Sequence, residues 1–204
     1  MSEPYVVGVD TGHTGALREA DHLLRALAAE LGLPADVLGC THHVRDGRRP
    51  HTALSFALPS ERAARAAWQR LTETGSGTPG DGPGSLLGAA FGEERHGPDE
   101  LAAGAAHAAA EHGALTGGRA VLYPGAGAVT GVLTVGRLLE VSAVDRVTVL
   151  GSPEGAAPEA ELVTRDHVRP EWRDGRLVLA TMPAAGGTLV PFEVPDPTPC
   201  CADH

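Results

Sequence analysis

The chain has 204 residues and a formal net charge of −10 at pH 7, and 42% of its residues are hydrophobic. This length suffices for one compact core or for two small subdomains, and the acidic balance argues against non-specific binding to a nucleic-acid backbone, which needs clustered cations. The sequence contains no lysine, which excludes Schiff-base catalysis and the lysine-dependent phosphate sites of P-loop proteins and protein kinases.

The first third of the chain alternates extended and helical patterns. Asp46-Gly47 lies between two extended runs and indicates a tight hairpin turn, and Ser60 is placed as the N-cap of a following helix. The resulting order β-α-β-β-α predicts a ferredoxin-like half over residues 1–72. The expected elements are a strand at 5–10, a glycine turn at 11–15, a helix at 16–31, strands at 36–44 and 51–58, and a helix at 60–72.

The remainder predicts a second α/β half over residues 86–192 with a β-rich C-terminal part, so the fold class is α+β. A Gly-, Pro- and Ser-rich stretch, 73–85, is interpreted as a flexible linker, and 193–204 as a tail without fold signal. The expected elements of this half are a helix at 100–113, a strand at 120–123, a glycine turn at 124–131, a helix from about 129 to 141, a strand at 146–150, and several strands from 161 onward.

Two turns carry candidate ligand chemistry. Gly125, Gly127 and Gly131 lie between an expected strand and an expected helix, where backbone N–H groups can bind an anion. A tight strand-to-helix turn without a ligand explains them as well. Asp10 ends the first strand beside a glycine-rich turn and is the best single candidate for binding Mg²⁺ or a polar ligand, with helix capping as the alternative.

Cysteine and histidine residues suggest a metal site as a further alternative. Cys40, His42 and His43 lie close together, and the chain ends with Cys200, Cys201 and His204. On a strand, Cys40 and His42 share one face and His43 takes the other, so the three do not converge. His107, Glu111 and His112 are interpreted as residues of a solvated helix face.

The sequence also predicts a compartment. The N-terminus enters an apolar strand directly, without the charged region of a signal peptide, and no apolar stretch approaches the ~18 residues of a membrane span. Three cysteines, an odd number, fit a reducing environment better than a disulfide framework. We therefore expect a cytoplasmic protein that does not enter a membrane.

Four blocks, taken in order, resemble the agmatinylcytidine synthetases, which attach agmatine to a tRNA cytidine using ATP. The similarity is greatest to stand-alone bacterial homologues of their N-terminal half. The blocks are VGVDTGHTGALREADHLLRALAAEL at 7–31, GCTHHVRDGRRPHTALSFAL at 39–58, GDGPGSLLGAA at 80–90 with GAGAVTGVLTVGRLL at 125–139, and RDHVRPEWRDGRLVLATMPA at 165–184.

The resemblance implies ATP and Mg²⁺ as cofactors and assigns roles to particular residues. Asp10, as the metal ligand, and Thr11 are expected at the ATP end, with His43 as a further catalytic candidate and Thr52 on the same hairpin. The phosphate loop is expected to comprise Gly125, Gly127, Thr130 and Gly131. The family's paired aspartates are a single Asp10 here, and the net charge of −10 argues against tRNA as a partner of this chain alone.

The leading hypothesis is a divergent homologue of these synthetases that binds a nucleotide or another small phosphate ligand. Whether it is an enzyme stays open; an active form would be an ATP-dependent ligase or phosphotransferase that activates a small substrate. Two alternatives remain: a non-catalytic binding or assembly module with a vestigial nucleotide site, and a Cys/His metal-binding protein. A homo-oligomer is compatible with each of them.

Overall fold

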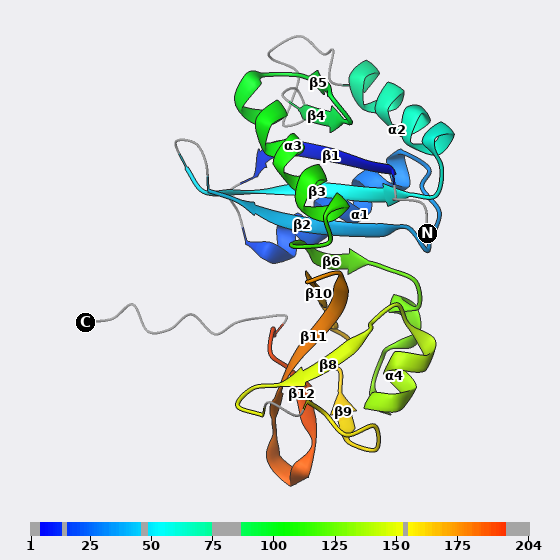
Figure 1. The fold of residues 1–204 in the computed structure, drawn as a ribbon, viewed down its shortest axis with the longest axis vertical. Helices are drawn as coiled ribbons and strands as arrows, with labels where there is room; N and C mark the ends of the chain where they lie inside the picture. The colour runs from blue at the N-terminus through cyan, green and yellow to red at the C-terminus, as the bar shows by residue number, and fades with distance from the viewer. Residues whose placement is uncertain (1–4, 14–15, 46–48, 75–86, 153–154, 195–204) are drawn as a thin grey trace, which may run out of the picture. The chain divides into compact units, whose positions relative to one another are not determined.

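A computed structural model describes residues 5–13, 16–45, 49–74, 87–152 and 155–194, which form four α-helices and twelve β-strands (Figure 1). The predicted α+β class is confirmed. Contacts divide the chain into two compact units, one of Met1–Pro124 with Glu171–Gly175 and one of Gly125–Pro170 with Arg176–His204. Residues 87–124 thus belong to the first unit, whereas the sequence placed them in a second half. Most of the predicted linker and tail, at 75–85 and 195–204, lies outside the described residues.

The first unit contains one antiparallel sheet of seven described strands in the order β5-β4-β1-β3-β2-β6-β10. Its central part, β4-β1-β3-β2, has the ferredoxin-like order, and the predicted β-α-β-β-α sequence of elements is confirmed. The elements are β1 (Tyr5–His13), α1 (Leu17–Glu30), β2 (Leu38–Val44), β3 (His51–Leu58), α2 (Glu61–Thr74), β4 (Gly88–Phe91), β5 (Glu94–His96), α3 (Asp99–Gly113), β6 (Arg119–Leu122) and β10 (Glu171–Arg173).

The helices follow from local signals that the sequence displays. The backbone N–H of Ala63 donates to the hydroxyl of Ser60 at 3.2 Å, so Ser60 caps α2 as predicted. Helix α1 ends before Gly32, whose φ of +63° suits glycine. Among the described residues, no helix is both long and apolar enough to cross a membrane.

The two faces of this sheet bury different kinds of side chain. Because successive strand residues point to opposite faces, Val7 and Val9 of β1 join the apolar core with α1 and α2, whereas Gly8 and Asp10 face α3. Figure 1 shows α3 crossing this second face. A Cβ atom on Gly8 would lie 1.9 Å from the carbonyl oxygen of Ala105, so α3 lies unusually close to β1. Polar side chains on the α3 face are therefore enclosed.

The apolar core on the opposite face consists of aliphatic residues and two phenylalanines. It includes Val7, Val9, Leu24, Leu27, Ala28, Leu31, Val37, Leu54, Phe56, Leu58, Ala64, Ala67, Leu71, Leu87, Ala89, Phe91 and Val121. Burial of these side chains is the main favourable contribution to the stability of the unit.

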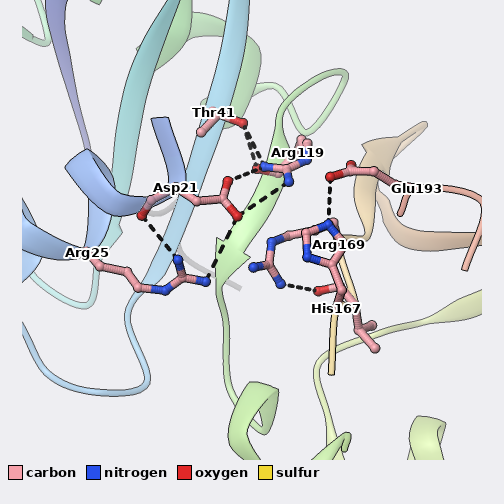
Figure 2. A network of polar contacts seen from close by, with 8 residues as sticks. Asp21, Arg25, Thr41, Arg119, His167, Arg169 and Glu193 are labelled. Atoms are coloured by element: carbon pink, nitrogen blue, oxygen red, sulfur yellow. Dashed lines mark hydrogen bonds and ion pairs between the residues drawn. The ribbon is translucent and has the colours of Figure 1, made fainter. Parts of the chain in front are cut away.

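The second unit is built around β11. Strand β8 pairs with β11 in parallel and β12 pairs with it antiparallel, while β9 joins β12 in parallel and β7 joins β9 antiparallel. The elements are the 3₁₀ turn Ala126–Ala128, β7 (Val132–Thr134), α4 (Val135–Val141), β8 (Arg146–Val149), β9 (Glu161–Val163), β11 (Arg176–Pro183), the 3₁₀ turn Ala185–Gly187 and β12 (Leu189–Pro191). In this unit His167 Nε2 lies 2.8 Å from Glu193 Oε1 (Figure 2).

The helix expected to follow the glycine turn begins later than predicted. It starts at Val135 because Val132–Thr134 pairs with Glu161–Val163 as a strand, and the hydroxyl of Thr134 accepts a hydrogen bond from the backbone N–H of Arg137 at 3.2 Å. The β-propensity of Val132 and Thr134, together with a pairing partner, overrides the helical pattern in this stretch.

A buried ion pair joins helix α1 to strand β6 in the first unit. Figure 2 shows the guanidinium of Arg119 against the carboxylate of Asp21, with Nη1 to Oδ1 at 2.5 Å and Nη2 to Oδ2 at 3.4 Å. Both side chains are more than nine-tenths buried. Thr41 of β2 lies beside the pair, with its hydroxyl 3.5 Å from the guanidinium and 3.4 Å from the Arg119 carbonyl. The pair therefore fixes α1 against two strands.

We expect Arg119→Met to lower the free energy of unfolding of the first unit by about 3–5 kcal/mol, because the carboxylate of Asp21 would stay buried without its main cation. Both tryptophans, Trp68 and Trp172, lie in this unit, so their fluorescence during urea unfolding follows it. The matched control is Arg62→Met, which replaces an exposed arginine of α2 in the same unit and should change stability by less than about 1 kcal/mol. Equal losses in the two variants would contradict a structural role for the buried pair.

Candidate functional site

Asp10 forms a buried ion pair with His51 at one end of the sheet. His51 Nε2 lies 2.7 Å from Asp10 Oδ2, and the backbone N–H of Gly12 donates to Asp10 Oδ1 at 2.7 Å. Asp10 is fully buried, because a Cβ atom on Gly104 of α3 would lie only 1.9 Å from its Oδ2. The carboxylate is thus enclosed between β1, β3 and α3.

The surroundings of His51 favour its charged form. Its Nδ1 lies 3.1 Å from the carbonyl oxygen of Arg49, so both ring nitrogens face acceptors and both must carry a proton. Burial acts to lower the pKa of His51, but the hydrogen bonds to Asp10 and to the Arg49 carbonyl, and the charges of Asp10 and Glu100, act to raise it. The net effect is a pKa above its ordinary value of 6.5.

A pocket of about 340 Å³ opens beside this pair. It lies between the end of β2 and the beginning of β3, next to the start of α1. Among the described lining side chains, three are basic, one is a threonine and none is acidic. The described lining residues are Leu17, His43, Val44, Arg45, Pro50, His51 and Thr52.

The structure gathers most of the residues predicted from the first two sequence blocks. His43 and Thr52 are register partners on β2 and β3 and both line the pocket, and Asp10 supports its wall through His51. Thr11 follows Asp10 in β1 but is not among the lining residues. His51 was missed. Its position was recoverable only from the register of β1 on β3, which a sequence does not display.

The predicted phosphate loop lies in the second unit and is satisfied by the protein itself. The backbone N–H of Gly131 donates to the carboxylate of Asp166 at 2.9 Å, so an internal anion occupies the donor expected to bind phosphate. The Gly131 carbonyl accepts from Thr164. A Cβ atom on Gly125 would lie 2.0 Å from the carbonyl oxygen of Val141, which gives this glycine a packing role.

Gly127 and Thr130 of the same loop are exposed, and the helix whose N-terminus was to complete the site begins only at Val135. Phosphate binding by the loop at 125–131 stays a prediction. The local geometry does not favour it.

A second polar cluster lies on the α3 face of the same sheet, and we call it the histidine cluster: Cys40, His42, Ser55, Glu111 and His112. Glu111 Oε2 lies 2.9 Å from His42 Nδ1, and His42 Nε2 lies 2.7 Å from Ser55 Oγ. Ser55 Oγ is 2.7 Å from His112 Nδ1, and His112 Nε2 is 4.0 Å from Cys40 Sγ. All of these residues except Glu111 are fully or almost fully buried.

The partners of these groups determine where the protons lie. Glu111 can only accept, so His42 donates from Nδ1 and accepts at Nε2 from the Ser55 hydroxyl. Ser55 Oγ then accepts from His112 Nδ1, which leaves His112 Nε2 to accept from the Cys40 thiol. Both imidazoles are neutral in this arrangement, and the hydrogen bonds run in one direction from the thiol to the carboxylate.

The electrostatics agree with this assignment. Burial lowers the pKa of His112 to about 3, with a further contribution from His42. Burial also lowers the pKa of His42, against the hydrogen bond and charge of Glu111. The hydrogen bond from His42 in turn lowers the pKa of Glu111. Burial raises the pKa of the Cys40 thiol, while Trp172 and Arg119 act to lower it.

Two sequence interpretations are settled by this cluster. Cys40 and His42 share one face and His43 is exposed on the other, as predicted. The interpretation of His112 as part of a solvated helix face is wrong, because the side chain is fully buried at the C-terminal end of α3, against the sheet. His107 is partly exposed, 3.5 Å from Glu111 Oε1. Cys200, Cys201 and His204 lie outside the described residues.

Comparison with known proteins gives no match: no protein-family model matches the chain, and neither a curated protein nor a solved structure resembles it significantly. The resemblance to the agmatinylcytidine synthetases therefore stays a prediction from the sequence motifs.

We expect the stabilising effect of His51 to decrease as the pH rises. Because its pKa is raised on folding, its contribution is fully present below the unfolded pKa of about 6.5 and is lost as the pH rises through the higher folded value. His51→Gln should therefore lower the free energy of unfolding by roughly 1.5–3 kcal/mol at pH 6 and by less at pH 9. Urea unfolding at both pH values, followed by tryptophan fluorescence, measures this.

The groups that face His51 are Asp10 from β1, Glu100 from α3 and, across the pocket, His43 and Arg45. The control is His22→Gln, which replaces an exposed histidine of α1 and should leave stability unchanged at both pH values. A difference between wild type and His51→Gln that is the same at pH 6 and pH 9 would show that His51 is not charged in the folded protein.

Proposed function

We propose that the first unit binds a small phosphate-class anion, either free or as part of a nucleotide, in the pocket between β2 and β3. The proposal rests on one observation: in a chain with a net charge of −10, the described lining of this pocket contains three basic side chains and no acidic one. A basic concavity in an acidic protein concentrates anions locally. Its volume of about 340 Å³ is within the range of small-molecule sites.

Each basic side chain contributes differently. Both N–H groups of His51 are used by Asp10 and Arg49, so His51 contributes positive charge to the wall, partly offset by Asp10, and no hydrogen bond to a ligand. Arg45 and His43 are exposed and can donate directly, and a guanidinium matches two phosphate oxygens at once. The hydroxyl of Thr52 lies in the same lining and can donate a further hydrogen bond.

The surroundings of Asp10, the predicted metal ligand, do not suit Mg²⁺. Both carboxylate oxygens of Asp10 already accept hydrogen bonds, the side chain is fully buried, and the backbone of α3 packs against it. A Mg²⁺ ion retains several waters and binds through accessible carboxylates. We therefore propose that the pocket binds a ligand without phosphoryl transfer. It fits a binding module better than an ATP-dependent ligase.

The test is isothermal titration of the full chain with inorganic phosphate and with ATP, in the absence of divalent metal. Arg45→Gln should weaken binding by roughly tenfold or more, because a hydrogen bond to a charged group contributes ~1.5–3 kcal/mol. His43→Gln should weaken it less. Raising the salt concentration should weaken wild-type binding and affect Arg45→Gln less, because the guanidinium charge is the one being screened.

Arg146→Gln is the matched control, since it removes one exposed positive charge from the second unit without touching the pocket. Affinity for phosphate and ATP should be the same in this variant as in the wild type. Absence of binding at millimolar phosphate and millimolar ATP, or equal affinities in Arg45→Gln and wild type, would overturn the proposal.

A further inference from the structure

The histidine cluster contains the donor set of a transition-metal site. Cys40 and His42 come from β2 and His112 comes from α3, and one ligand atom from each lies within 4.8 Å of the other two. All three side chains are buried. We propose that Cys40, His42 and His112 bind one divalent transition-metal ion of the zinc type, at a site separate from the phosphate pocket.

The chemistry of the donors favours this class of ion. A thiolate with two imidazoles is a soft-to-borderline set, which suits zinc and is unsuited to Mg²⁺ or Ca²⁺. In a tetrahedral zinc site, metal–sulfur and metal–nitrogen distances of about 2.3 and 2.0–2.1 Å place donors about 3.3–3.6 Å apart. Cys40 Sγ and His112 Nε2 are 4.0 Å apart. Only small side-chain movements would bring these donors to metal-binding distance.

Glu111 supplies the outer support that metal-binding histidines typically have. Its Oε2 accepts from His42 Nδ1 at 2.9 Å, which fixes the tautomer that leaves His42 Nε2 available as a ligand. Its side chain is 34% exposed, so it neutralises part of the metal charge without being buried itself. Glu111 is therefore a positioning residue and not a ligand.

Trp172 gives an independent indication. Its indole N–H is buried and makes no hydrogen bond of normal geometry among the described residues, and it lies close enough to the Cys40 thiol to act to lower its pKa. Its ring lies 6.4 Å from that of His112. A buried donor without an acceptor is unfavourable. A metal-bound thiolate would be a stronger acceptor for this N–H than the neutral thiol, because its sulfur carries negative charge.

Gly118 shapes the space between the ligands. A Cβ atom at this position would lie 2.6 Å from His42 Cε1, 3.1 Å from His42 Nε2 and 3.1 Å from Cys40 Cβ. Glycine here leaves the His42 and Cys40 side chains unobstructed. Binding breaks the S–H bond of Cys40, forms the metal–sulfur and two metal–nitrogen bonds, and releases one proton to solvent. The hydroxyl of Ser55 gives up its hydrogen bond to His42 Nε2 and keeps the one from His112 Nδ1.

The test uses Co²⁺ as a spectroscopic substitute for zinc. Because the site is buried, the full reduced chain is unfolded in urea and refolded with one equivalent of Co²⁺. We expect a thiolate-to-cobalt charge-transfer band in the near ultraviolet that saturates at one ion per chain and disappears on addition of Zn²⁺. A Cys200→Ser/Cys201→Ser variant should keep the band, and Cys40→Ser should lose it.

Glu111→Gln provides a second test in case Cys40→Ser does not refold. We expect this variant to fold, because Glu111 is partly exposed and is not a ligand. Its Co²⁺ dissociation constant should rise roughly 10–100-fold while the band is retained at saturation. His22→Gln, an exposed histidine of α1, is the control and should bind as the wild type does. A wild-type chain without the band, a band that survives in Cys40→Ser, a band that disappears in the Cys200→Ser/Cys201→Ser variant, or unchanged affinity in Glu111→Gln overturns the proposal.

Discussion

The close approach of α3 to the sheet is the constraint on which both candidate sites depend. Where the helix backbone passes over β1, only glycine fits, as the positions of Gly8 and Gly104 show. No water layer fits in such a contact, so each polar side chain that points at α3 has to find a protein partner. Asp10 finds His51, and His42 finds Glu111 and Ser55.

Three histidines on this face show how their partners determine charge. His51 has two acceptors, a carbonyl and a carboxylate, and so holds two protons. His42 and His112 each have one acceptor and one donor within a continuous chain, and burial favours their neutral form. The same residue type thus supplies a fixed cation beside an open pocket and neutral nitrogen donors in a closed cluster, which suit an anion and a metal ion respectively.

The sequence predicted local structure well and non-local contacts poorly. Hydrophobic periodicity and the Ser60 cap predicted the order of elements from β1 to α2, because these signals act within a few residues; the turn predicted at Asp46-Gly47 lies outside the described residues. His51 beside Asp10, and His112 beside Cys40, depend on pairing between β1 and β3 and on the placement of α3. His112 was misjudged because its neighbours at helical spacing, Ala105 and Ala108, are too small to show which face is buried. The start of the helix after the glycine turn was misplaced for a related reason: Val132–Thr134 forms a strand with β9, which lies about 30 residues further on.

The glycine loop of the second unit and the pocket of the first unit differ in which groups are already satisfied. At Gly131 the backbone N–H faces Asp166, so any incoming anion would have to displace a carboxylate that the chain itself supplies. At the pocket, the carboxylate of Asp10 is buried and pairs with His51. The exposed side chain of Arg45 is part of the pocket lining. We expect an anion to bind more favourably at the pocket, where it does not have to displace Asp10, than at the glycine loop. At the loop it would have to replace the carboxylate of Asp166 on the Gly131 N–H, so one charged hydrogen bond would be exchanged for another. The anion site suggested by sequence motifs is therefore better placed on the β2–β3 hairpin than on the glycine loop.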